Sequence, residues 1–108
     1  MRQQQQSGFI LLACKALLRE FMAATHHEVQ GVDYEWEEAV RRGRRYARLA
    51  TLTRQQACAA ANLYAAMVRL VNEWSLEETQ SSEGQEVGEI VMGLHEALKH
   101  YLQQQAAT

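Results

Sequence analysis

The sequence predicts an all-α protein, a small bundle of three to four helices that forms a dimer. Three observations predict this fold. The chain of 108 residues contains no proline, the residue that breaks helix interiors and marks turns. Apolar residues recur at helical spacing in four segments, and no segment alternates with period two for long enough to form a strand. The length suits a single domain, which we place over residues 1–108.

The N-terminal residues 1–7 are polar and rich in glutamine, and we expect them to be a disordered lead. The stretch Leu11–Cys14 is similar to a lipoprotein cleavage site. However, the apolar run before the cysteine is shorter than the roughly 7 to 15 residues of a signal core. Cys14 and Cys58 are the only cysteines, and both lie in apolar helical runs. They are expected to be reduced core thiols of a cytoplasmic protein.

The first helix is predicted over residues 8–26. Its segment from 9 to 24 is apolar almost all the way round, and only three charged side chains interrupt it. Since a helix with so narrow a polar side cannot lie half in water, it is either central to a core or half buried in another chain. The sequence therefore predicts a homodimer through this helix, with Leu11, Leu18 and Met22 in the interface.

The second helix is predicted over residues 34–50, with Asp33 as its N-cap. Glutamates fill its first turns and arginines lie toward its end, which is the order that the helix dipole favours. Its apolar line includes small residues, which allow a neighbouring helix to approach closely. The members of this line are Trp36, Val40, Gly43, Ala47 and Ala50.

The third helix is predicted over residues 53–74. Thr53 and Gln56 match a capping box, in which two side chains three residues apart each accept a hydrogen bond from the other residue's backbone N–H. Ser75 and Glu78 repeat this pattern and predict a short helical turn. One face of the third helix carries apolar side chains at helical spacing: Ala57, Ala60, Tyr64, Met67, Val71 and Trp74.

The fourth helix is predicted over residues 85–104, after a polar loop at residues 80–84. It has one apolar stripe and one charged face, as is typical of a helix that covers a core. His95 and His100 are expected to be surface residues on this helix. The apolar stripe consists of Val87, Val91, Leu94, Leu98 and Tyr101.

No residue pattern indicates an enzyme, a cofactor or a metal site. The sequence has no Walker loop, no Gly-x-Ser-x-Gly elbow and no His-Glu-x-x-His motif. His26 and His27 stand at a predicted helix end, where such side chains help to cap exposed carbonyls. Adjacent helical residues also point about 100° apart, so the two rings do not converge on one ion. We therefore expect a non-enzymatic protein without a cofactor or metal.

A cluster of arginines at residues 41–45 offers an alternative function, because arginines contact phosphates. Residues 55–68 are similar to a helix-turn-helix pattern with its turn at Asn62. The supposed reading helix is poor in hydrogen-bonding groups. The formal net charge of −2 also gives no strong field for nucleic acid or a membrane. DNA binding is an alternative here, and nucleic acid is not the expected partner.

The whole chain resembles small helical antiactivators that bind quorum-sensing receptors of the LuxR type. The resemblance rests on the size of the chain, on the apolar opening helix Phe9–Ala24 and on the apolar segment Asn62–Val68. It implies a homodimer that captures the ligand-binding domain of the receptor and blocks receptor dimerisation. A second, shorter resemblance is to flagellar or type III export chaperones, through the segment Trp36–Val40 at an acidic helix start.

These observations favour a regulatory protein that binds and inhibits a partner protein by covering its dimerisation surface. A transcription factor of the LuxR type is the expected partner. The contact is expected to use apolar side chains that the protein does not need for its own core, since each helix of a small bundle buries little more than one face. The predicted partner-binding residues lie on the third helix: Leu63, Tyr64, Met67 and Val71. DNA binding and export chaperoning remain alternatives.

Overall fold

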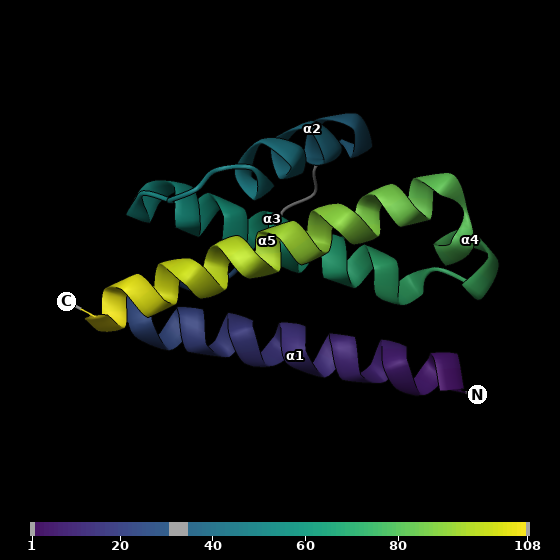
Figure 1. Cartoon of the computed structure of the whole chain (residues 1–108), viewed down its shortest axis with the longest axis horizontal. Coiled ribbons are helices and arrows are strands. Elements are labelled where there is room, and N and C mark those ends of the chain that lie inside the picture. Colours follow the sequence, from purple (N-terminus) through teal and green to yellow (C-terminus); the bar gives the residue numbers. More distant parts are fainter. Residues whose placement is uncertain (1, 31–34, 108) are drawn as a thin grey trace.

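The computed structural model describes residues 2–30 and 35–107, with side chains from Leu11 onward in these ranges (Figure 1). Every element in this part of the chain is an α-helix, so the predicted all-α fold is confirmed. In chain order the helices are α1 (Arg2–Thr25), α2 (Trp36–Ala47), α3 (Arg54–Glu73), α4 (Leu76–Gln80) and α5 (Ser82–Ala107).

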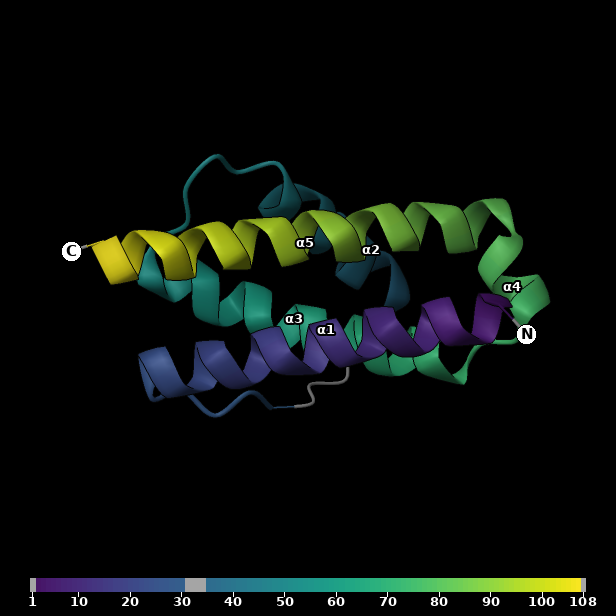
Figure 2. The same cartoon turned by 60° about the horizontal axis from the view of Figure 1, so that its bottom comes forward.

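Helix α3 contacts three other helices, namely α1, α2 and α5. Helix α5 packs beside α3 and also contacts α1, α2 and the short α4. Figure 1 shows α1 and α2 on opposite sides of the α3–α5 pair. Figure 2 shows α1 and α5 as two long neighbouring helices with α3 behind them. The two central helices of this bundle are therefore α3 and α5, and α1 lies at its edge.

Helix α1 begins at Arg2, so the expected disordered lead is part of the helix. Glutamine is a good helix former, and four glutamines therefore extend the helix backward from its apolar part. The helix ends at Thr25, close to the predicted end. His26 follows with a φ of 53°, the left-handed conformation that commonly terminates helices. The hydroxyl of Thr25 donates to the carbonyl of Phe21 at 2.7 Å, which satisfies this buried polar group.

Helix α2 is shorter than predicted at both ends. It begins at Trp36 with Glu35 as its N-cap, and the side chain of Glu35 makes no capping hydrogen bond. The expected cap Asp33 and the expected first residue Tyr34 lie outside the described residues. At the other end the helix stops at Ala47, three residues early, and the backbone N–H of Arg48 bonds carbonyls of the last turn.

Both predicted capping boxes are present. Thr53 Oγ1 accepts from the backbone N–H of Gln56 at 3.1 Å, and Gln56 Oε1 accepts from the N–H of Thr53 at 3.0 Å. Ser75 and Glu78 make the same reciprocal pair and start α4. The hydroxyls and carboxylates thus satisfy backbone donors that the first helical turn leaves free, which fixes where α3 and α4 begin.

The predicted loop at residues 80–84 is almost entirely helical. A single residue, Ser81, separates α4 from α5, and its hydroxyl accepts from the backbone N–H of Gly84 at 3.1 Å. A Cβ on Gly84 would stand 2.3 Å from the carbonyl oxygen of Glu78. The sharp corner between the helices therefore requires glycine here, and the serine acts as a helix N-cap.

The core lies where α1, α2, α3 and α5 face one another. Each helix contributes the stripe that faces its neighbours, and α4 contributes no buried residue. The largest fully buried side chains are Tyr64, Phe21, Leu63, Met67, Leu94, Leu98 and Val87.

Small residues set the distance between α2 and α5. A Cβ on Gly43 would lie 2.5 Å from Cγ2 of Ile90, and a Cβ on Gly93 would lie 2.7 Å from Cβ of Ala47. Real Cβ atoms do not approach that closely, so the two helices can pack at this distance only with glycine at both positions. The prediction that Gly43 and Ala47 allow a close approach is confirmed. Ala50 lies beyond the end of the helix and is exposed.

Replacing Gly93 by alanine should destabilise the protein, although alanine is the better helix former. The new methyl group has no room against Ala47, and overpacking of this kind costs about 1 to 3 kcal/mol. Urea unfolding followed by circular dichroism measures the change. Gly88 is the matched control on the same helix, because a Cβ there meets nothing within 4 Å. Gly88→Ala should stabilise the protein by about 0.5 to 1 kcal/mol, and equal effects of both variants would contradict the close packing.

Candidate functional site

The structure places three of the four predicted partner-binding residues in the core. Leu63, Tyr64 and Met67 are at most 2% exposed, and Val71 is half-buried near the end of α3. The prediction that this side of α3 is exposed is therefore wrong. The physical reason is the central position of α3, since α1, α2 and α5 all pack on it and leave little of its apolar surface free.

Tyr64 is the centre of a small polar cluster inside the core. Its hydroxyl lies 2.9 Å from Nδ1 of His95 on α5, and it also makes a hydrogen bond with the thiol of Cys14 on α1. His95 is half-buried by this contact, so its expected position on the surface is wrong. His100 is exposed as expected. The cluster connects three helices and gives a buried hydroxyl the partners that burial demands.

The chemistry of this cluster is structural. Burial raises the pKa of the Cys14 thiol, and the hydrogen bond with Tyr64 opposes that rise only in part. Burial also raises the pKa of Tyr64, with further contributions from the hydrogen bond and the charge interaction with Cys14. A nucleophilic cysteine needs a lowered pKa, because the thiolate is the reactive form. Cys14 and Tyr64 are instead held in their neutral forms.

Helix α1 is half-buried, and one apolar side of it faces solvent. Its buried stripe contains Cys14, Leu17 and Phe21. The predicted interface residues Leu11 and Leu18 are half-buried against the same core. The alternative that α1 is central to the core is thus wrong. On the opposite side lies a set of exposed apolar residues, which we call the α1 outer face: Leu12, Ala16, Met22 and Ala23.

Leu12 is the residue of this face that sequence reasoning missed. It is 65% exposed, and Met22, the third predicted interface residue, is 37% exposed. Successive helical residues turn by about 100°, so Leu12 points roughly opposite to Cys14. Once the buried stripe is known, a helical wheel identifies Leu12. Met92 on the neighbouring α5 and Leu76 on α4 are also exposed, at 51% and 56%, and were not singled out either.

The outer side of α2 is strongly basic. Five arginines lie within residues 41–48 and all are exposed. Two of them are neutralised by carboxylates. Arg42 pairs with Glu38 one turn earlier at 2.8 Å, and Arg44 pairs with Glu86 on α5. Beside them, α2 and α5 enclose a groove of about 230 Å³.

Helix α3 continues without a break through Asn62, as the predicted helix over residues 53–74 requires, so the turn of the alternative helix-turn-helix motif is absent. The side chain of Asn62 accepts a hydrogen bond from the backbone N–H of Gln30 at 3.1 Å. Tyr64, which the motif would present to a DNA groove, is fully buried. This arrangement removes the helix-turn-helix basis for DNA binding.

The two histidines at the end of α1 have structural positions. His27 packs edge-on against the ring of Phe21, and His26 occupies the left-handed position after α1. Within residues 2–30 and 35–107, no three histidine, cysteine or acidic side chains gather where they could hold a metal ion.

Cys14 and Cys58 are free thiols. Among the helices of the described part of the chain, none is both long enough and apolar enough to cross a bilayer.

Comparisons with known proteins find no match: no protein-family model matches the chain, and neither a curated protein nor a solved structure is similar to it.

The substitution Tyr64→Ala distinguishes a core role of Tyr64 from the partner-binding role predicted from the sequence, because only a core role makes the protein much less stable. A core residue of this size should cost about 3 to 5 kcal/mol of unfolding free energy when it is truncated, with a large fall in melting temperature. Thermal and denaturant unfolding measure it. Leu12→Ala is the comparison, because exposed positions usually change stability by no more than about 0.5 kcal/mol. A Tyr64→Ala protein with the parent's melting temperature would contradict the core assignment.

Proposed function

We propose that this chain is a non-enzymatic regulatory protein that binds a partner protein through the α1 outer face. The observation that carries the proposal is the exposure of Leu12 and Met22 on a helix that lies at the edge of the bundle. Exposed apolar side chains that share the solvent side of one helix are candidates for a protein contact. Met92 on the neighbouring α5 adds a further exposed apolar side chain.

The surroundings of this face suit a protein contact. Charged side chains, Lys15, Arg19 and Glu20, lie among the apolar ones and are exposed. Protein interfaces combine apolar anchors with polar and charged side chains. A helix that presents apolar side chains along one side can lie in an apolar groove of its partner.

The kind of partner comes from the resemblance to antiactivators of LuxR-type receptors. On that basis the partner is a transcription factor of the LuxR type, and the chain covers the surface through which the receptor dimerises. The proposal includes a cytoplasmic location, where the receptor is expected to act. In the absence of the partner, the same face of α1 closes on a second copy and gives the homodimer expected from the sequence.

The experiment co-expresses the chain with a LuxR-type receptor and a reporter gene that the receptor activates. The parent chain should lower reporter output and co-elute with the receptor on size exclusion. The double variant Leu12→Glu, Met22→Glu should lose both effects, because it places two charges in the apolar contact. Far-UV circular dichroism should remain that of the parent, since both side chains are exposed. Sedimentation of the isolated chain should show a dimer for the parent and a monomer for the variant.

Arg69→Glu is the matched control, because it is exposed on α3 and changes the net charge by the same two units. It should repress the reporter as the parent does. A double variant that still binds the receptor, or a parent chain that binds no LuxR-type receptor and sediments as a monomer, would contradict the proposal.

A further inference from the structure

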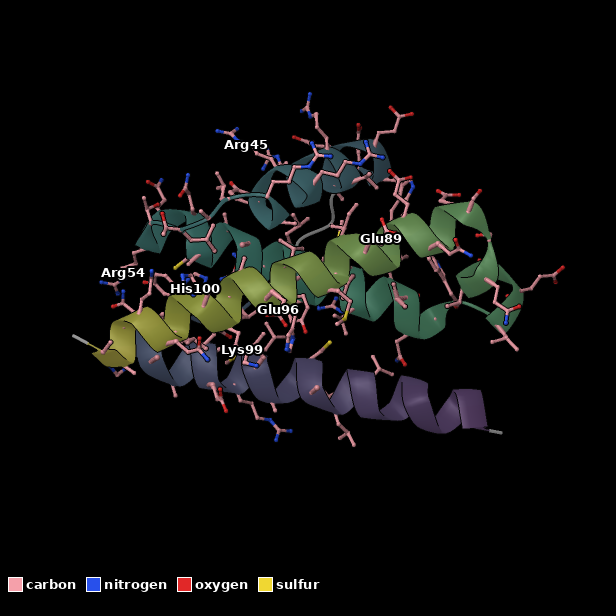
Figure 3. The ribbon with its side chains drawn as sticks, viewed as in Figure 1. Arg45, Arg54, Glu89, Glu96, Lys99 and His100 are labelled. Atoms are coloured by element: carbon pink, nitrogen blue, oxygen red, sulfur yellow. The ribbon has the colours of Figure 1, made fainter. Side chains whose placement is uncertain are left out.

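The outer side of α2 carries three arginines whose guanidinium groups have no partner within the described residues. Arg41, Arg45 and Arg48 are spaced by four and three residues, so they lie on one side of the helix. Arg48 is the C-cap and keeps a right-handed helical conformation. All three are exposed, and Figure 3 shows Arg45 pointing away from the bundle. We call these three residues the arginine row.

The row differs from the arginines beside it. Arg42 and Arg44 already have carboxylate partners, on α2 itself and on α5. The uncompensated positive charge of α2 is therefore concentrated in the row. Guanidinium groups present several N–H donors in a plane, and this geometry matches the two oxygens of a carboxylate.

A groove adjoins one end of this row, at Arg41. Its walls include the apolar side chains Trp36, Val40 and Val87, and Arg41 stands on its edge. The indole N–H of Trp36 donates to Glu83 at 2.6 Å, which fixes the ring in the wall. At about 230 Å³ the groove is smaller than the roughly 300 to 1,000 Å³ of sites for drug-sized ligands. Its size suits a single bulky apolar side chain.

We propose that the arginine row and the adjoining groove bind an acidic helical segment of a protein. Carboxylates at positions i, i+4 and i+7 of that segment have the same spacing along the helix axis as the three arginines of the row, because both are α-helices. Each carboxylate meets one guanidinium, and an apolar side chain of the segment enters the groove. The inference rests on the proposed function only in taking a protein as the partner, and it uses a surface other than α1.

Charge around the row favours a protein segment over nucleic acid. Glu37, Glu83 and Glu86 line the groove next to it. The side chain that the segment places in the groove is uncharged, so these carboxylates do not repel it, whereas a phosphate backbone that followed α2 would carry negative charge along the whole groove. The formal net charge of −2 also gives no attraction for a long polyanion at a distance.

The test measures the fluorescence anisotropy of a labelled helical peptide with glutamates at i, i+4 and i+7 and a leucine beside them. The parent chain should bind it saturably, and added salt should weaken the binding. The triple variant Arg41→Gln, Arg45→Gln, Arg48→Gln should raise the Kd about tenfold, as expected for three exposed ion pairs. The same peptide with glutamines in place of glutamates should bind as weakly.

A matched control removes three other exposed cations, Arg19, Arg69 and Lys99, by changing each to glutamine. Figure 3 shows Lys99 on α5, away from α2. This control lowers the net charge by the same three units and should change the Kd less than twofold. Equal effects of the two triple variants, no saturable binding, or tighter binding of a duplex DNA probe would overturn the inference. Receptor repression by the α1 outer face could persist in each of those cases, so the two proposals fail separately.

Discussion

The burial of α3 is the constraint on which the other helices depend. Helix α3 has apolar or small side chains around most of its surface, and these side chains leave water only if other helices cover α3 on several sides. Helices α1, α2 and α5 do so. The cover brings the hydroxyl of Tyr64 into the core, where His95 and Cys14 supply its hydrogen-bond partners. A buried hydroxyl without partners would cost about 1 to 3 kcal/mol, so this cluster also fixes how α1 and α5 sit against α3.

The local features of this fold were predictable because they depend on short-range chemistry. The capping boxes at Thr53 and Ser75 follow from two side chains three residues apart, and both are present. The close approach at Gly43 follows from the absence of a side chain. The loop at residues 80–84 could not be predicted in the same way. Its helical form rests on Ser81 as an N-cap and on the absence of a side chain at Gly84, and a segment rich in serine and glycine is equally typical of a loop.

The helical period of the apolar residues did not predict which apolar surface is exposed. A helical period identifies which residues share a face, but it does not say which of two apolar helices occupies the centre. Helix α1 is the more apolar in its middle, yet it lies at the edge. Helix α3 is central because its alanines let neighbours approach closely, with Ala57, Ala60 and Ala61 fully buried. The predicted contact residues on α3 are therefore core, and the exposed apolar side is that of α1, with Leu12 as its most exposed large residue.

Native-state hydrogen exchange tests the central position of α3 most directly, because backbone amides exchange only when the structure around them opens. The amides of residues 57–68, with those of residues 87–98 in α5, should be the most protected in the protein, with opening free energies close to that of global unfolding. The amides of α4 should exchange through local opening, because this helix has no buried residue. Protection of α1 that exceeds that of residues 57–68 would contradict the account, since it would make α1 the central helix.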